Sequence, residues 1–213
     1  MNMRLTAGGV RELHWHTADE WAIVLYGSAR ITAMDRDGKS FVADVKKNDL
    51  WYFPSGIPHS IQGLDPDGTE FMLVFDDGDF SESETVLLSD SMAHLPPEVL
   101  AKNFGVAEQA LKNVPKYELF IFQTAVPGSL EADQQAAAGT LGKSPSDFTF
   151  RTMEMPPTKR TKAERCGSLI RARSRPQLTL RWRWSRFTRE ECENCIGTPT
   201  PMNGSITLRA RQE

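Results

Sequence analysis

Six short segments rich in Val, Ile, Leu, Phe and Trp follow one another closely between residues 9 and 76, and turn-forming residues separate them. The segments are residues 9–16, 21–34, 41–45, 50–53, 57–62 and 70–76. Two of the separating turns, residues 35–38 and 65–68, end in Asp-Gly, a dipeptide that marks a reversal of the chain. Strands spaced this closely predict an all-β sandwich or barrel.

Two histidines at alternate positions, His14 and His16, end the first of these segments. Alternate side chains of a strand share a face, so both imidazoles are expected to point the same way. Glu20 follows after a short turn, and His59 adds a third imidazole. Three imidazoles and one carboxylate suit an octahedral Mn or Fe ion with two open positions, whereas catalytic zinc usually takes three protein ligands and water. The four residues are therefore predicted metal ligands. For the first two histidines alone, a solvated strand is the alternative.

Glycine and proline residues around the predicted ligands are spaced as in the cupin family. The pattern of Gly8, His14, His16, Glu20 and Gly27 resembles the first cupin motif, and Pro54, Gly56 and His59 resemble the second. Asn48 and Gln62 stand where the second motif usually has Gly and Asn, and neither is a ligand position. The resemblance implies a cupin (jelly-roll) β-barrel, with its lid loop, over residues 1–95.

Longer stretches resemble the oxalate decarboxylases, which are manganese proteins with two cupin domains. The matching stretches are residues 11–16, 19–21, 50–63, 74–78, 101–106 and 127–130, and the resemblance covers residues 3–158. It implies a carboxy-lyase that converts oxalate to formate and carbon dioxide, with Mn(II) as cofactor and dioxygen as co-catalyst. The manganese ligands that it implies are His14, His16, Glu20 and His59.

The same resemblance implies catalytic roles for Arg11 and Glu82. Arg11 matches the arginine that holds the substrate, and a guanidinium can orient and polarise a carboxylate. Residues 81–85 match the lid in which decarboxylases carry Ser-Glu-Asn-Ser, and Glu82 would deliver a proton to the nascent formate. The third and fourth positions of that tetrad differ here (Ser83 and Glu84), which leaves the balance between decarboxylase and oxidase open. Taken without the resemblance, the arginine is a surface residue of a strand and the loop is a solvated acidic turn.

Two other functions stay open: an oxalate oxidase, and a non-catalytic metal-binding or storage cupin, including an impaired fragment with a metal site and no turnover. Oxalate is the expected small-molecule partner.

A composition of 25% charged and 39% hydrophobic residues is that of an ordinary soluble protein, and no apolar run is long enough to cross a bilayer. We expect no nucleic-acid or membrane partner. The family forms homo-oligomers, but half of that contact surface is expected to be missing here. No signal peptide is visible, whereas fungal relatives are often secreted or bound to the cell wall, so the compartment stays open.

Residues 76–93 are polar and lack a strong period, which predicts a long loop that serves as a lid. Residues 96–147 are predicted to form a helical segment and a linker. Within them we expect a helix over residues 97–112, a strand over residues 117–122 and a linker over residues 127–147. His94 is interpreted as structural rather than as a ligand. Residues 148–158 are predicted to begin a second cupin domain.

The sequence changes character near Lys159. Residues 1–158 contain 12 basic and 23 acidic residues, whereas residues 159–213 contain 13 basic and 5 acidic residues and all three cysteines. Taken at face value, the Arg-rich and Trp-rich sequence of residues 159–213 would indicate nucleic-acid or membrane binding, and Cys192 and Cys195 would indicate half of a zinc site.

A near copy of the first motif lies hidden in this tail. When the last base of each codon is joined to the first two bases of the next, residues 189–206 permit Arg-Glu-Leu-His-Trp-His and then Asp-Glu-Trp. Some of these residues are forced, since Asn194 followed by Cys195 must give Leu. We infer that residues 159–213 are an out-of-frame reading of a two-cupin gene and that the chain is incomplete at both ends. Because natural selection never acted on this out-of-frame sequence to form a buried core, residues 159–213 are expected to be disordered.

Overall fold

The structure is a computed structural model that describes residues 1–154, 159–160, 164–169 and 180–185. The chain divides into two compact units, Met1–Arg151 and Thr152–Glu213. The predicted domain boundaries after residues 95, 147 and 158 stay predictions.

The first unit is built mainly from strands. They are β1 (Asn2–Leu5), β2 (Gly9–Trp15), β3 (Glu20–Met34), β4 (Ser40–Lys46), β5 (Leu50–Phe53), β6 (His59–Gly63), β7 (Thr69–Phe75), β8 (Val86–Leu87), β9 (Ile121–Gln123) and β10 (Thr149–Phe150). The helices are η1 (Glu82–Glu84), α1 (Leu88–Ala93), α2 (Pro97–Phe104), η2 (Glu108–Leu111) and α3 (Leu130–Ala138), where η marks a 3-10 helix. Six of the strands overlap the six segments expected from the sequence.

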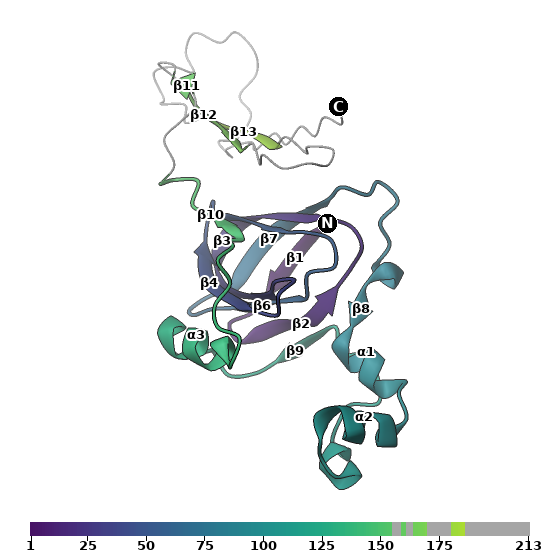
Figure 1. The fold of residues 1–213 in the computed structure, drawn as a ribbon. Helices are drawn as coiled ribbons and strands as arrows, with labels where there is room; N and C mark the ends of the chain where they lie inside the picture. The colour runs from purple at the N-terminus through teal and green to yellow at the C-terminus, as the bar shows by residue number, and fades with distance from the viewer. Residues whose placement is uncertain (155–158, 161–163, 170–179, 186–213) are drawn as a thin grey trace. The chain divides into compact units, whose positions relative to one another are not determined.

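These strands form one antiparallel sheet that curls around a core (Figure 1). The main path runs β1-β7-β3-β6-β2-β8, with β4 and β5 paired to β3, β9 to β2, and β10 to β5. β3 has two sets of partners, because Glu20–Ile23 pairs with β5 and Ser28–Met34 pairs with β4. Between these halves Gly27 has φ +69°, and a Cβ at this position would lie 1.9 Å from the carbonyl oxygen of Gly68. Only glycine fits there. The expected all-β barrel is confirmed.

The core fills the space that the curled sheet encloses. Its buried residues are Leu5, Ala22, Val24, Ala29, Ile31, Ala33, Val45, Trp51, Phe53, Ile57, Ile61, Phe71, Leu73 and Phe148. Trp51, Phe53 and Phe71 are wholly buried, and burial of each such side chain contributes about 1.5–3 kcal/mol. Phe53 also stacks on His59, with 4.2 Å between the ring centroids. The core therefore fixes the start of β6, which carries one of the predicted metal ligands.

The sequence did not indicate β1. It pairs with β7 over four residues, and its last residue, Leu5, is almost fully buried in the core. The segment is short and carries Asn2 and Arg4, so it lacks the continuous apolar run that marked the other strands. Its partner strand decides its conformation.

Two segments expected to lack regular structure contain some. The loop over residues 76–93 holds η1, β8 and α1, and the linker over residues 127–147 holds α3. The Ser129 side chain caps the start of α3 by accepting a hydrogen bond from the Ala132 backbone, and Arg30 pairs with Asp133. The stretch expected as a linker therefore contains a short helix, which its own Ser129 cap and its contact with the barrel stabilise. The expected helix over residues 97–112 is in turn two pieces, since α2 ends at residue 104.

The second unit contains three described strands, β11 (Lys159–Arg160), β12 (Glu164–Leu169) and β13 (Leu180–Ser185), which form an antiparallel sheet in that order. The remainder of the inferred out-of-frame tail, with Cys192 and Cys195, lies outside the described residues. Its expected disorder stays a prediction. Within the part of the chain that is described, no helix has the length and apolar character needed to cross a membrane.

Candidate metal centre

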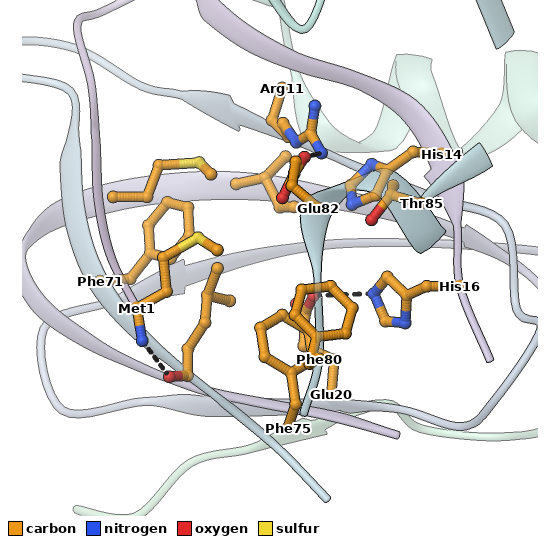
Figure 2. A pocket seen from close by; sticks show the side chains of 13 residues that line it. Met1, Arg11, His14, His16, Glu20, Phe71, Phe75, Phe80, Glu82 and Thr85 are labelled. Atoms are coloured by element: carbon orange, nitrogen blue, oxygen red, sulfur yellow. Dashed lines mark hydrogen bonds and ion pairs between the residues drawn. The ribbon is translucent and has the colours of Figure 1, made fainter. Parts of the chain in front are cut away.

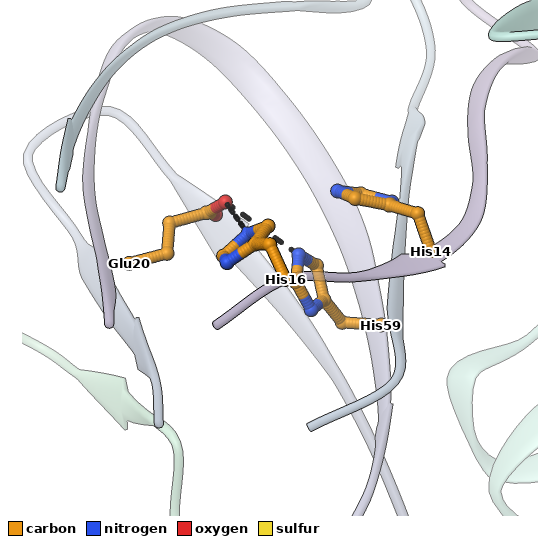
Figure 3. Close-up of side chains that lie close together, drawn as sticks. All are labelled: His14, His16, Glu20 and His59. Atoms are coloured by element: carbon orange, nitrogen blue, oxygen red, sulfur yellow. Dashed lines mark hydrogen bonds and ion pairs between the residues drawn. The ribbon is translucent and has the colours of Figure 1, made fainter. Parts of the chain in front are cut away.

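The four predicted ligands meet at one end of the barrel. His14 lies near the end of β2, His16 follows that strand, Glu20 begins β3 and His59 begins β6. Each residue offers one ligand atom, and these atoms all lie within 4.8 Å of one another (Figure 3). All four residues are at most 5% exposed. The structure thus brings together three imidazoles and one carboxylate in a buried group that can hold a metal ion.

Backbone carbonyl groups hold the imidazoles in one orientation. The Nδ1 atoms of His14, His16 and His59 lie 2.7–2.8 Å from carbonyl oxygens only two residues away in the chain. A carbonyl oxygen can only accept, so each Nδ1 carries the hydrogen and donates it. Each Nε2 is left with a free lone pair, as a metal ligand requires. This local geometry selects the ligating tautomer before any metal binds.

Glu20 is fixed at both carboxylate oxygens. Its Oε1 accepts a hydrogen bond of 2.9 Å from Nε1 of Trp51, and its Oε2 lies 3.3 Å from Nε2 of His16. Oε2 is also 3.5 Å from Nε2 of His59. Among the described residues, none forms a hydrogen bond with that His59 nitrogen, although it is buried. A buried nitrogen lone pair without a partner is rare, and a metal ion at this position would satisfy it. The donor set therefore fits a metal.

The charge states of the ligands suit cation binding. Burial lowers the pKa of His14 to about 2, and the neighbouring His59 and Arg11 contribute to that shift. Burial also acts against a charged His16, but its hydrogen bond with Glu20 outweighs this effect and raises its pKa. Burial alone would raise the pKa of Glu20, whereas His59 and the hydrogen bond with His16 hold it well below its ordinary value. A neutral His14 and an ionised Glu20 are ready to bind a cation.

A pocket opens directly beside three of these ligands. It is lined by Met1, Met3, Arg11, His14, His16, Glu20, Ile61, Phe71, Leu73, Phe75, Phe80, Glu82 and Thr85. Figure 2 shows Arg11 and Glu82 next to each other at one side of the pocket, joined as an ion pair. The Arg11 side chain is 4% exposed and forms an ion pair with Glu82, whose side chain is 39% exposed. The two predicted catalytic residues thus share the pocket with the metal ligands, and their roles stay predictions.

The lid segment, residues 76–87, brings Glu82 to the pocket. Within it the Ser81 side chain caps η1 by accepting a hydrogen bond from the Ser83 backbone. Phe80 stacks on Phe75 with 3.8 Å between the ring centroids, and both rings meet the edge of His16 (Figure 2). The lid segment therefore covers one side of a metal ligand with apolar surface.

Several residues of the site escaped the sequence analysis. Trp51 belongs to the core, and its indole also orients a predicted ligand. Phe80 and Thr85 line the pocket from the lid segment, and no spacing rule marks them. His94, expected to be structural, lies outside the metal-capable group of the described residues, and its side chain is 77% exposed. Only contacts between segments far apart in the chain reveal the additional residues.

The chain is similar to known oxalate decarboxylases. It is 53% identical to oxalate decarboxylase OxdC of Bacillus subtilis (strain 168) over 157 residues, which span 74% of this chain and 40% of that protein. It is 35% identical to a probable oxalate decarboxylase of Arthroderma benhamiae over 156 residues, 72% of this chain and 37% of that protein. The B. subtilis enzyme at pH 4.6 superposes with a TM-score of 0.79 at 45% identity, covering 86% of this chain and 48% of that chain. A structure of the same enzyme concerned with its Mn(II) centres gives a TM-score of 0.79 at 44% identity, with the same coverage.

These relatives are longer than the chain, which spans less than half the length of each of them. A model of the cupin family matches residues 1–112, which is more than half of the chain. The curled antiparallel sheet and the His-rich group at its end agree with that match. The chain belongs to the cupin family.

Proposed function

We propose that this chain carries a manganese-dependent oxalate decarboxylase site, which converts oxalate to formate and carbon dioxide. The observation that carries the proposal is the pocket in which Arg11 and Glu82 lie beside the metal-capable group. A dianion needs a buried cation to hold it, and removal of carbon dioxide needs a proton donor beside the remaining carbon. The pocket provides one of each. The similarity to oxalate decarboxylases supports the same assignment.

Manganese is the proposed cofactor because the donor set mixes three imidazole nitrogens with one carboxylate oxygen. A similar structure concerns the Mn(II) centres of the B. subtilis enzyme, which supports this choice. His14, His16, Glu20 and His59 would hold the ion, and the bound ion would supply a redox-active Lewis acid beside the substrate. Dioxygen as a co-catalyst stays a prediction.

Arg11 would bind and orient one carboxylate of oxalate. Its guanidinium is buried and presents paired N–H groups, which match the geometry of a carboxylate. Without substrate, the Glu82 carboxylate forms an ion pair with this guanidinium. Oxalate and Glu82 therefore compete for Arg11, and binding of oxalate releases the Glu82 carboxyl group from its ion pair.

Glu82 would then act as the proton donor. When the C–C bond of oxalate breaks, carbon dioxide leaves and the electron pair stays on the other carbon. A proton from Glu82 bonds to this carbon and completes formate. Because the Glu82 side chain is partly exposed, its carboxylate takes up this proton from solvent after it leaves Arg11 and before the C–C bond breaks, whereas the almost fully buried Arg11 keeps its place.

The apolar wall of the pocket would strengthen both steps. Phe71, Leu73, Phe75 and Phe80 are among the residues that line it. Charges interact more strongly where apolar side chains exclude water, so Arg11 holds a dianion better here than on an open surface. The Phe75–Phe80 stack places this wall beside His16.

A product assay tests the function. The purified chain is loaded with Mn(II), its metal content is measured, and oxalate is added in the presence of air. We expect formate and carbon dioxide in equal amounts. Hydrogen peroxide in place of formate would identify an oxalate oxidase, and bound manganese without either product would identify a non-catalytic metal-binding cupin. The assembly of the chain stays a prediction, which the mass of the native protein in solution would test.

A further inference from the structure

Glu12 is a buried carboxylate that the proposed chemistry does not use. It lies on β2 between Arg11 and the two strand histidines and is 4% exposed. None of the ion pairs among the described residues includes it. Its oxygens instead accept three hydrogen bonds: 2.9 Å from the Ser89 backbone, 2.9 Å from the Ser89 hydroxyl and 2.7 Å from the Phe120 backbone. A buried carboxylate placed on neutral donors from two distant segments has a specific structural task.

The first segment that Glu12 holds supports Arg11. Phe120 has φ +54°, a conformation that is costly for a residue with a side chain and persists only when neighbours impose it. Its carbonyl oxygen accepts hydrogen bonds from the Glu12 backbone at 3.1 Å and from Nη1 of Arg11 at 3.4 Å. The guanidinium carbon lies 5.5 Å from the centre of the Phe120 ring, within reach of a cation–π interaction. Glu12 therefore fixes the residue on which the guanidinium rests.

The second segment that Glu12 holds is the start of α1, which directly follows the lid segment. Ser89 lies in the first turn of α1, two residues after β8, and β8 and β9 both pair with β2 (Figure 1). The Ser89 hydroxyl donates to Glu12 and accepts a hydrogen bond of 2.9 Å from the Leu119 backbone. The Glu12 carboxylate thus connects Ser89, which follows the lid segment, with Phe120, which supports Arg11.

We propose that Glu12 is a positioning residue that holds Arg11 in its oxalate-binding orientation through Phe120 and anchors the lid segment through Ser89. The inference rests on the proposed function, since it assigns oxalate to Arg11. The Glu12 carboxylate contacts Ser89 and Phe120 and none of the predicted ligands, and only the Glu12 backbone carbonyl oxygen accepts a hydrogen bond from Nδ1 of His14, so manganese binding does not depend on the charge of Glu12. Substrate binding does, because Glu82 leaves Arg11 when oxalate arrives and Phe120 then remains as its support.

Glu12→Gln tests this role with little change of volume. An amide offers one oxygen, so an N–H of the new side chain must face the Ser89 or the Phe120 backbone N–H, and at least one hydrogen bond is lost. Loss of one such contact is expected to weaken oxalate binding roughly tenfold. Asp49→Asn is the matched control, because Asp49 is also a buried carboxylate, bound by the Lys46 backbone and Arg151 away from the pocket.

The experiment measures manganese content, thermal stability and the calorimetric Kd for oxalate in the manganese-loaded full chain. We expect full manganese content in E12Q with the weaker Kd, and a Kd within about twofold of wild type in D49N at a similar loss of stability. Ser89→Ala, which removes one of the three donors, should weaken oxalate binding less and serves if E12Q does not fold. In the kinetic assay KM should rise more than kcat falls.

Four results would overturn the inference: an unchanged Kd for oxalate in E12Q, loss of manganese in E12Q, equal weakening of oxalate binding in D49N, or no oxalate binding by the wild-type chain. Failure of the proposed function looks different. A wild-type chain that binds oxalate and releases no formate is not a decarboxylase, yet its Kd relative to that of E12Q still decides the role of Glu12.

Discussion

The metal-ligand group and the lid segment face the same pocket, but different contacts hold them. His14, His16 and His59 are fixed by backbone carbonyl groups two residues away, within or beside the strands of the barrel. Glu82 lies on a 3-10 helix of three residues, none of which is buried, and its ion pair with Arg11 brings it to the pocket. The fold alone therefore sets the side of the pocket that carries the histidines, whereas the lid side depends on an ion pair that the proposed substrate would replace. The proposed function, which needs a permanently bound metal and a transiently bound substrate, requires both kinds of contact.

His59→Ala is expected to have the largest effect, because it removes one of the four predicted metal ligands. Manganese binding should weaken by more than ~100-fold, since even changes to groups that merely support a ligand can cost that much. Mass spectrometry of the metal content checks this. His94→Ala is the control, since that exposed imidazole should leave the metal content unchanged. Full manganese content in H59A would show that this histidine is not a ligand.

Glu82→Gln tests the lid segment. Without a carboxyl proton, formate production should fall by roughly 10²- to 10⁴-fold, while bound manganese stays constant. The assay compares it with Glu84→Gln, which changes the same 3-10 helix at a residue outside the pocket lining. If E82Q retained wild-type formate production, Glu82 would not be the proton donor.

Trp51→Phe addresses the support behind the ligands. The phenyl ring keeps most of the packing but removes the N–H that binds Oε1 of Glu20, so manganese affinity should fall by about 10- to 100-fold. Trp21→Phe is a matched control, because among the described residues its buried Nε1 has no hydrogen-bond partner. Equal losses of affinity in the two variants would contradict a specific role for the Trp51–Glu20 hydrogen bond.

The smallest effect concerns the metal-free chain as the pH falls. The pKa of His14 is lowered to about 2 from its ordinary value of 6.5. Between pH 6.5 and about pH 2, His14 is therefore protonated in the unfolded chain and neutral in the folded chain. The stability from His14 is therefore complete above pH 6.5 and declines with falling pH, by at most about 1.4 kcal/mol per pH unit. His16 acts oppositely, since its raised pKa makes its contribution largest at low pH. A two-dimensional NMR titration of the imidazoles checks both, and protonation of His14 near pH 6 would contradict the burial argument.

Much of the site could be predicted from local sequence. The alternation of side chains in a strand was enough to place His14 and His16 on one face, and a short turn brings Glu20 beside them. The strand segments were similarly visible, because their apolar residues are concentrated and Gly-containing turns separate them. β1 was missed because its pairing with β7 rather than its own composition stabilises it. α3 was missed although its Ala-rich and Gln-rich sequence and its Ser129 cap favour a helix, to which contact with the barrel adds. The resemblance supplied Arg11 and Glu82, which residue spacing alone would not have singled out.

The sequence by itself determined which residues of this cupin can bind a metal and which segments form its barrel, because both follow from residue types at short spacing. Only the tertiary structure decided how the pocket is held. The hydrogen bond from Trp51 to Glu20, the ion pair of Arg11 with Glu82, and the contacts of Glu12 with Ser89 and Phe120 all join residues distant in the chain. Such contacts depend on the closure of the sheet, which brings β8 and β9 onto β2. No local pattern encodes that closure, since it arises from the packing of the whole core.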